Sequence, residues 1–469
     1  MSTTAIAWLI SYCYLMLRGL SKPVFVLCAY LLTFYAGPQF WWWGGPLVAA
    51  PVRWNLVTAI SLVVISLVFR SDAVPLKSRD RWFMGLLLLY ILNAWAVHNF
   101  LAVEPVRSYK EFDILWKGVG LAIVARLALH NLKDLNVALM AIMVLTFWVS
   151  YEVYFNGAGS MIHGRLEGLR FPGANASNGT AILVSMSLPI VGYFFIVNPI
   201  PYARWIAFGF SPFILNVVLL CNSRGTYLGL AASGLILVLL ARGKSRKHAI
   251  LIALGGVAAF LFLARSEQIW ERLFSINATS EERDGSAQSR INFTKAGIQM
   301  IADHPLGSGG GAAFYSPLGF SYIAPFGQPH PRAAHNGYVN IAAGWGVQGF
   351  LLLISAIFVS ATSTFLSMLR LDPRRHEKTN FLGACVLAAI FGQLVSTVFG
   401  DYLDGEWFLW LAAFGLVYSS AIDRLLQAER ETEIEESQEY LETESPDELW
   451  DSPLNPEDRY SDRNPVFTQ

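Results

Sequence analysis

The sequence predicts an all-α polytopic membrane protein with about twelve transmembrane helices and one long loop that carries an amphipathic helix. Hydrophobic residues make up 54% of the 469 positions and charged residues only 14%, whereas roughly a quarter of a soluble protein's residues are charged. Apolar stretches approaching the ~20 residues that cross a bilayer recur along the chain. The connections between them are mostly short, except for residues 265–336.

Twelve apolar segments are the expected spans. They cover residues 23–40, 56–69, 82–97, 116–129, 135–154, 179–197, 206–221, 226–241, 248–264, 339–369, 381–399 and 407–422. The apolar stretch 5–17 is short for a span, so we expect residues 1–22 to form an N-terminal interfacial segment. Residues 23–264 then hold the first nine helices, 265–336 the long loop, 337–427 the last three helices and 428–469 a tail.

The positions of Lys and Arg orient these helices, because short cytoplasmic loops are enriched in both residues. Basic clusters lie at residues 70–81, 242–247 and 370–378, and twelve alternating spans place all three on one side. We expect that side to be the cytoplasm, with the long loop on the opposite side of the membrane, which is the periplasm if the membrane is a bacterial inner membrane. The tail has 14 acidic and 3 basic residues, a net charge of −11, and should be a disordered cytoplasmic segment.

The long loop has internal order near its end. Ile291, Ile298 and Ile301 recur at helical spacing within residues 290–303, which predicts an amphipathic helix near the membrane surface. A glycine-rich run follows at residues 307–311. It lacks the Gly-Lys-Ser/Thr of a phosphate-binding P-loop, and we expect a flexible turn whose backbone can approach a substrate.

His335 stands where the long loop becomes the next helix. The positive end of a helix dipole disfavours an imidazolium there, so a neutral imidazole can accept a proton near pH 7. The plainer interpretation is an interfacial His that only hydrogen-bonds the loop.

Arg224 opens the helix expected at residues 226–241, behind Asn222 and Ser223, which are both good N-cap residues. An Arg beside free helix N–H groups makes an anion site. The alternative is a terminal Arg that snorkels to the interface. Such residues usually gather on the cytoplasmic side, and Arg224 is expected on the other side.

The order of these motifs resembles the O-antigen ligase and O-antigen polymerase-like family of polytopic membrane glycan transferases. Members carry an Arg-led amphipathic helix, a His-Pro-Leu-Gly-x-Gly turn and a His-Asn pair that opens the next span. Here these are Arg290, residues 304–309, and His335 with Asn336. Asn222-Ser-Arg-Gly225 and Arg170-Phe-Pro-Gly-x-x-Ala-Ser-Asn178 are further matches.

The resemblance implies a membrane fold of the GT-C-like type and a glycan donor carried on undecaprenyl pyrophosphate. The acceptor is a hydroxyl group on lipid A–core in a ligase, on a second glycan chain in a polymerase, or on a protein in an O-oligosaccharyltransferase. These alternatives, in lipopolysaccharide or exopolysaccharide biosynthesis, stay open. The expected partners are these substrates and membrane lipid, not nucleic acid. The sequence departs from many relatives at residues 342–346, Ala-Ala-Gly-Trp-Gly, which lack an acidic residue.

By the same resemblance, His335 is the catalytic residue that accepts or orients the acceptor's proton. Arg224, Arg290 and Arg170 are then expected to bind the pyrophosphate, because bidentate Arg contacts stabilise a departing phosphate. Further candidates are Arg332, Asn336 and Arg165. We expect no metal and no cofactor, because the periplasmic loops lack an Asp-x-Asp motif and the donor is already activated.

Three further questions stay open. Asp401, Asp404 and Glu406 form either a solvated acidic turn or a contact to the acceptor. Arg126, inside an expected span, is either a functional intramembrane charge or a side chain that snorkels past His130. A transporter is the alternative function, although few charges lie within the helices and no inverted repeat is visible.

Overall fold

The computed structural model describes residues 1–50, 52–69, 76–173, 176–263, 270, 285–311, 313–327 and 334–443. Within these residues the elements are helices, apart from one two-stranded hairpin. The chain forms two units, Met1–Ala421 and Ile422–Gln469. The first holds the helical bundle, and in the second the last helix continues to Thr443.

The helices follow one another along the whole chain. They are α1 (Thr3–Gly19), α2 (Pro23–Tyr35), η1 (Pro38–Phe40), α3 (Gly45–Val48), α4 (Trp54–Val68), α5 (Ser78–Leu101), α6 (Pro105–Ala128), α7 (Leu132–Asn156), α8 (Ser177–Ser185), α9 (Ser187–Val197), α10 (Ala203–Cys221), α11 (Arg224–Leu240), α12 (Lys244–Leu263), α14 (Gly285–Asp303), η4 (Ala313–Tyr315), α15 (Pro317–Ile323), η5 (Ala324–Phe326), α16 (Gly337–Leu369), α17 (Glu377–Thr397) and α18 (Glu406–Thr443). Strands β1 (Ser160–Ile162) and β2 (Arg165–Glu167) pair antiparallel, with Met161 opposite Leu166.

Nine helical segments among the described residues are long and apolar enough to cross a membrane. They are α2 with η1, α5, α7, α8 with α9, α10, α12, α16, α17 and α18. Helices α4 and α11 are apolar but shorter, and α6 carries most of its charges in its first half. All twelve expected segments are helical, and the all-α polytopic membrane fold is confirmed. The total of twelve spans and the interfacial position of α1 stay predictions.

An ion pair holds Arg126 inside the bundle. Its Nε lies 2.7 Å from Asp80 Oδ1, and its Nη2 donates to Ser420 Oγ at 2.9 Å. The Arg126 and Asp80 side chains are only 3% and 0% exposed. Breaking such a pair leaves a buried charge uncompensated. Arg126 therefore joins α5, α6 and α18 instead of snorkelling past His130.

Helix α16 is broken at Gly346, where the backbone has φ 81° and ψ 165°. The glycine-rich turn of the long loop enters this break. Val347 N donates to Pro305 O at 2.9 Å, and Gly309 N donates to Gly344 O at 3.0 Å. Backbone groups freed inside a membrane must find partners within the protein, and the turn supplies them.

The glycine-rich turn is therefore packed, and the expectation of a flexible turn open to a substrate is wrong. Residues 307–310 are buried. A Cβ on Gly310 would lie 1.8 Å from Trp345 Cζ2, and Val103 N, between α5 and α6, donates to Ser308 O at 3.0 Å. The glycines allow the loop to approach other backbone segments closely.

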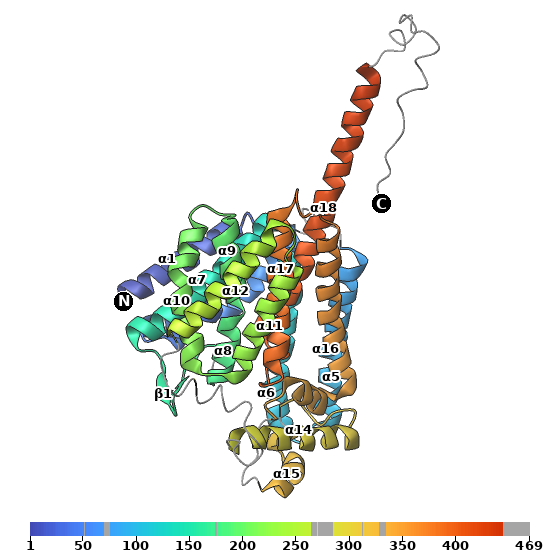
Figure 1. Cartoon of the computed structure of the whole chain (residues 1–469). Coiled ribbons are helices and arrows are strands. Elements are labelled where there is room, and N and C mark those ends of the chain that lie inside the picture. The colour runs from blue at the N-terminus through green and yellow to red at the C-terminus, as the bar shows by residue number, and fades with distance from the viewer. Residues whose placement is uncertain are drawn as a thin grey trace, which may run out of the picture. The chain divides into compact units, whose positions relative to one another are not determined.

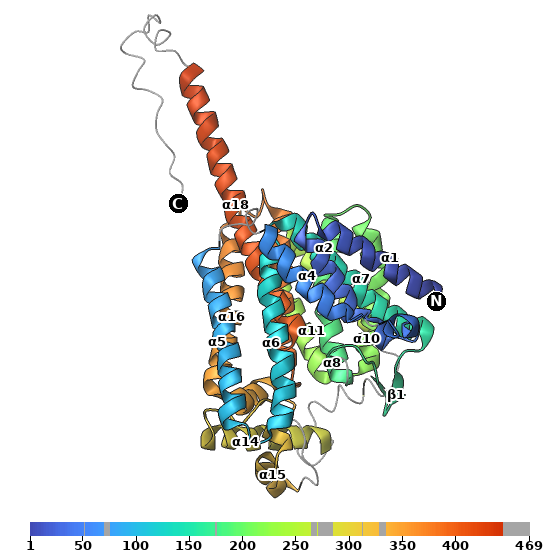
Figure 2. The ribbon, with the colours of Figure 1, turned by 180° about the vertical axis from the view of Figure 1, so that it is seen from behind.

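Helix α14 is the expected amphipathic helix, but it begins earlier and buries a different face. Phe293, Ala296 and Met300 are fully buried against α15 and the start of α16, whereas Ile291 and Ile298 are 37% and 58% exposed. Both views show α14 lying across the ends of α5, α6 and α16, at the same end as the hairpin (Figure 1, Figure 2). The contact of α14 with the membrane surface stays a prediction. Ile291 and Ile298 are the side chains that we expect to make it.

The turn between α17 and α18 holds a half-buried carboxyl group, that of Asp404. Tyr90 Oη, on α5, donates to Asp404 Oδ2 at 3.5 Å. Burial, followed by the nearby charge of Glu111 on α6, raises the pKa of Asp404 from 3.8 to about 7. The turn is therefore tied to α5 and α6 at the end of the bundle that α14 covers.

Replacing Asp404 with Asn should stabilise the protein above pH 7 and change little near pH 4. Between pH 3.8 and about 7 the folded protein keeps a proton that the unfolded chain has lost, so stability falls as pH rises through this window. Asn cannot ionise and still offers an oxygen to Tyr90. Thermal unfolding in detergent should show the variant melting roughly 1–3 °C above wild type at pH 8. The same shift at pH 4 and pH 8 would contradict the assignment.

The two ends of the bundle should lie on opposite sides of the membrane. Ser321 on α15 and Arg374 between α16 and α17 are both exposed, and a Cys13→Ser background removes the exposed native thiol. In intact cells an impermeant maleimide should label Ser321→Cys, and it should label Arg374→Cys only after lysis. The reverse pattern would overturn the expected orientation.

Candidate active site

The cap at the start of α16 fixes the backbone around His335. Asn336 Oδ1 accepts the N–H groups of Tyr338 and Val339 at 3.1 and 3.3 Å, as an N-cap Asn does. His335, one residue earlier, has φ 52°, in the left-handed region that residues other than Gly seldom adopt. That conformation costs about 1–2 kcal/mol. Strain of this kind, held by the surrounding structure, marks a side chain whose position matters.

Asp401, in the turn between α17 and α18, contacts both the cap and the imidazole. Its Oδ1 accepts the N–H of Asn336 at 3.1 Å, and its Oδ2 lies 3.5 Å from His335 Nδ1. The Asp401 and His335 side chains are 20% and 40% exposed. When Nδ1 carries its proton toward the carboxylate, the lone pair of the neutral ring is on Nε2. The contact therefore orients His335 to accept a proton through Nε2.

The acidic partner of His335 comes from a segment that the motifs did not identify. The position after the His-Asn pair, where many relatives carry an acid, has none in this sequence. Of the three acids in the turn after α17, Glu406 accepts from Tyr30 Oη at 2.7 Å and Asp404 accepts from Tyr90. Only the fold reveals that Asp401 faces His335, and none of the three is a simply solvated side chain.

Arg165 joins two segments that carry the family resemblance. From strand β2, its Nη2 donates to Asn178 Oδ1 at 2.7 Å and lies 3.4 Å from Asn222 O, which also accepts. On the same strand, Glu167 Oε2 accepts the N–H of Ser177 at 2.9 Å. Asn178 lies in the first turn of α8, and Asn222 immediately precedes the N-cap of α11. The guanidinium therefore lies where α10 ends and where α8 and α11 begin, and the Glu167 carboxylate already supplies a negative charge at the start of α8.

Arg224 is the first residue of α11 and is half-buried. Ser223 occupies the N-cap position but does not cap the helix with its side chain. Its hydroxyl instead accepts from Thr226 Oγ1 at 3.1 Å. Asn222 is not the cap either, because it precedes that position with a left-handed φ of 46°. Neither predicted residue therefore caps α11 with its side chain.

The other predicted residues are placed less directly. Arg170 is exposed on the segment before α8. Arg290 is half-buried on α14, whose Met300 packs against the start of α16. Arg332 lies outside the described residues. The structure thus joins Arg165 with the segment before Arg224, and His335 with Asp401 and Asn336, while Arg170 and Arg290 lie on elements around them.

Tyr402 connects the arginine side of this region with the histidine side. It follows Asp401 in the chain, and a Cβ on Gly179 would lie 2.8 Å from its Oη. Gly179 directly follows Asn178, the partner of Arg165. Burial, with smaller contributions from the charges of Asp401 and Glu167, raises the pKa of Tyr402. A succession of neighbouring residues therefore links Arg165 to His335.

The polar start of α6 also reaches this region, which no motif indicated. The Arg107 guanidinium carbon lies 3.5 Å from the centroid of the Tyr315 ring. A Cβ on Gly311 would lie 2.6 Å from Glu111 Cγ. The only sequence signal is the density of charges at the start of an apolar helix, and that pattern equally describes a solvated helix end.

Among the described residues, no group of three or more His, Cys, Asp or Glu side chains is arranged to hold a metal ion. The groups that do gather here are guanidinium, imidazole and carboxylate. Together they can bind an anion and move a proton.

Comparison with known families finds a match over part of the chain. Residues 209–354 match the family model described as O-antigen ligase. The match includes Arg224, Arg290 and His335, whereas Arg165 and Asp401 lie outside it. No curated protein matches the chain. The resemblance found in the motifs is confirmed over this segment, which is similar to the O-antigen ligase family, and the chain as a whole is an all-α polytopic membrane protein.

Proposed function

We propose that the protein transfers a glycan from an undecaprenyl-pyrophosphate carrier to a hydroxyl acceptor at the periplasmic face of the bacterial inner membrane. The observation that carries the proposal is the path of contacts from Arg165, through the start of α8 and Tyr402, to the Asp401–His335 pair. This path links arginine side chains to an imidazole and a carboxylate at one end of the bundle, and residues 209–354 of that bundle match the O-antigen ligase family model.

The cationic surface suits the leaving group. Pyrophosphate departs with negative charge, and Arg165 and Arg224 lie beside the N-terminal ends of α8 and α11. The guanidinium groups and the positive end of the α11 dipole favour an anion there. In this proposal Arg290 and Arg170 also contact the pyrophosphate. Bidentate contact by a planar guanidinium stabilises the charge that develops as the glycosyl bond breaks.

The imidazole–carboxylate pair suits the acceptor. The acceptor hydroxyl must lose its proton as its oxygen attacks the anomeric carbon of the donor. His335 Nε2 accepts that proton, and Asp401 stabilises the imidazolium that forms. The donor already carries a good leaving group, so the reaction needs no ATP. Arginines take the place of a metal in this proposal.

An O-antigen ligase-like reaction in lipopolysaccharide or exopolysaccharide biosynthesis is the form that the family match favours. A polymerase or a protein O-oligosaccharyltransferase would use the same chemistry on another acceptor. The contacts described above lie at one end of the bundle rather than at its mid-length, which supports a transferase over a transporter. The glycan acceptor that loses its label in a deletion strain, and regains it on complementation, identifies the reaction.

Substitutions should separate donor binding from proton transfer. His335→Ala removes the base and leaves the anion surface, so it should bind a lipid-linked donor analogue normally while transfer falls by roughly two to four orders of magnitude. Arg224→Ala and Arg290→Ala should weaken donor binding and transfer together. Binding and single-turnover transfer by purified protein in nanodiscs measure both. Near-normal transfer by folded His335→Ala would refute the mechanism.

Asp401→Asn should reduce transfer by about 10- to 100-fold with donor binding unchanged, the scale typical of a carboxylate that orients a functional His. Asn still offers an oxygen to the N–H of Asn336, so the cap of α16 is kept. The matched control is Asp113→Asn on α6, whose carboxylate pairs with Lys117 on an exposed surface.

Combining Asp401→Asn with His335→Ala completes a double-mutant cycle. If Asp401 acts through the imidazole, the double variant should transfer glycan no more slowly than His335→Ala alone. Additive losses would assign Asp401 a role independent of His335.

A further inference from the structure

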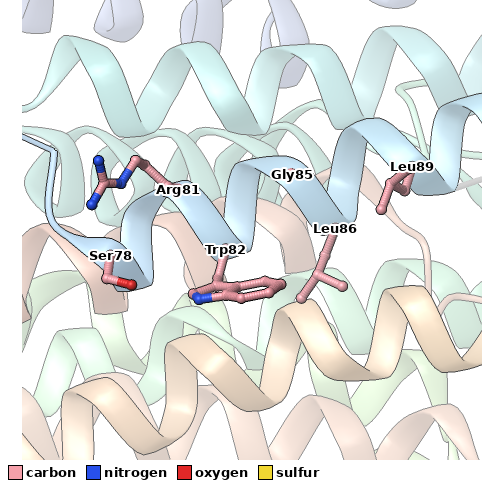
Figure 3. A pocket seen from close by; sticks show the side chains of 6 residues that line it. All are labelled: Ser78, Arg81, Trp82, Gly85, Leu86 and Leu89. Carbon is pink, nitrogen blue, oxygen red and sulfur yellow. The ribbon is translucent and has the colours of Figure 1, made fainter.

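A groove runs along α5 at the end of the bundle opposite the candidate active site. Six residues line it: Ser78, Arg81, Trp82, Gly85, Leu86 and Leu89. They recur three or four positions apart, which places them along one side of the helix, and Figure 3 shows their side chains along α5. The groove is open at Gly85, where an added Cβ would meet no atom within 4 Å.

The chemistry of the groove changes along its length. Arg81 and Trp82 are exposed near the start of α5, and the Trp82 side chain is 66% exposed. Leu86 and Leu89 follow toward the middle of the helix, and Leu89 is 52% exposed. Helix α5 is long and apolar enough to cross a membrane. Its basic and aromatic start therefore belongs at the level of lipid head groups, and its leucines belong in the hydrocarbon.

Arg81 differs from the arginines near it. Arg126 is paired with Asp80, and Arg79 Nη2 donates to Ser420 Oγ at 3.5 Å. Among the described residues, which do not include 70–75, the Arg81 side chain has no hydrogen bond or ion pair, although its backbone N–H donates to Lys77 O. Its guanidinium is thus available to an anion at the membrane interface.

We propose that this groove binds one anionic glycerophospholipid, with its phosphate on Arg81 and an acyl chain passing over Gly85. Basic side chains at the cytoplasmic leaflet attract anionic head groups, and Trp82 suits the interface between head group and chain. A zwitterionic lipid would offer the same chain without the net charge. An apolar protein helix would place no anion against Arg81. An anionic lipid matches both the charge of Arg81 and the apolar part of the groove.

Lipid retention by the purified full-length protein tests the site. The protein in detergent is titrated with phosphatidylglycerol or with phosphatidylcholine, and bound lipid is counted by native mass spectrometry. Wild type should retain phosphatidylglycerol at several-fold lower concentration than phosphatidylcholine. Arg81→Gln should remove this preference. Gly85→Leu should reduce retention of both lipids, because the new side chain fills the groove without meeting another atom.

Two matched controls separate the groove from general effects. Arg374→Gln removes another exposed cation between α16 and α17. Gly209→Leu adds the same side chain on α10, at a position where a Cβ also meets nothing within 4 Å. Both controls should retain phosphatidylglycerol like wild type.

Three results would overturn the proposal. Unchanged retention by Arg81→Gln and Gly85→Leu would show that lipid binds elsewhere. Equal retention of both lipids by wild type would show a groove without charge recognition. A changed oligomeric mass in Gly85→Leu, with lipid retention intact, would assign the groove to a second copy of the chain. None of these readouts depends on glycan transfer, so they do not depend on the proposed function.

Discussion

The break in α16 determines where the long loop must go. Backbone groups freed at Gly346 cannot be left to the lipid, and hydrogen bonds from the turn at residues 305–309 satisfy them. Because this turn follows α14 and precedes His335 in the chain, fixing it limits the positions of both. The turn also contacts the connection between α5 and α6, which brings the polar start of α6 to the same end of the bundle. The glycine-rich segment thus packs against the broken helix α16. Because glycine has no side chain, the two backbone segments can approach closely enough to hydrogen-bond.

Opposite charges then gather on two sides of one region. Arg165 and Arg224 lie beside the positive ends of two helices, while Asp401 faces His335 from the turn between α17 and α18. The arrangement suits a reaction that releases an anion and takes up a proton. The left-handed backbone at His335 is unfavourable in itself, and the Asn336 cap together with Asp401 accounts for its persistence.

Local sequence patterns predicted the positions of the helices, which depend mainly on local sequence. Apolar runs located all twelve helical segments, and spacing located α14. Spacing could not predict which face of α14 is buried. Ile291 and Ile298 recur at helical spacing, but Phe293 and Met300 are the residues that pack against other helices. Arg126 could be identified as unusual, yet its partner Asp80 is on another helix. Asp401 was visible as an acid but not as the neighbour of His335, since that contact depends on how two distant turns meet. Arg107 and Glu111 carried no motif at all.

The central claim is that one region holds the departing pyrophosphate and the accepting base. A cryo-electron microscopy structure with a non-transferable undecaprenyl-pyrophosphate-linked donor analogue, in nanodiscs, tests this claim most directly. The account predicts pyrophosphate density in contact with Arg165 and Arg224, and the anomeric carbon on the side facing His335 Nε2. Density for the pyrophosphate at mid-bundle, or at the opposite end near Arg81, would contradict it.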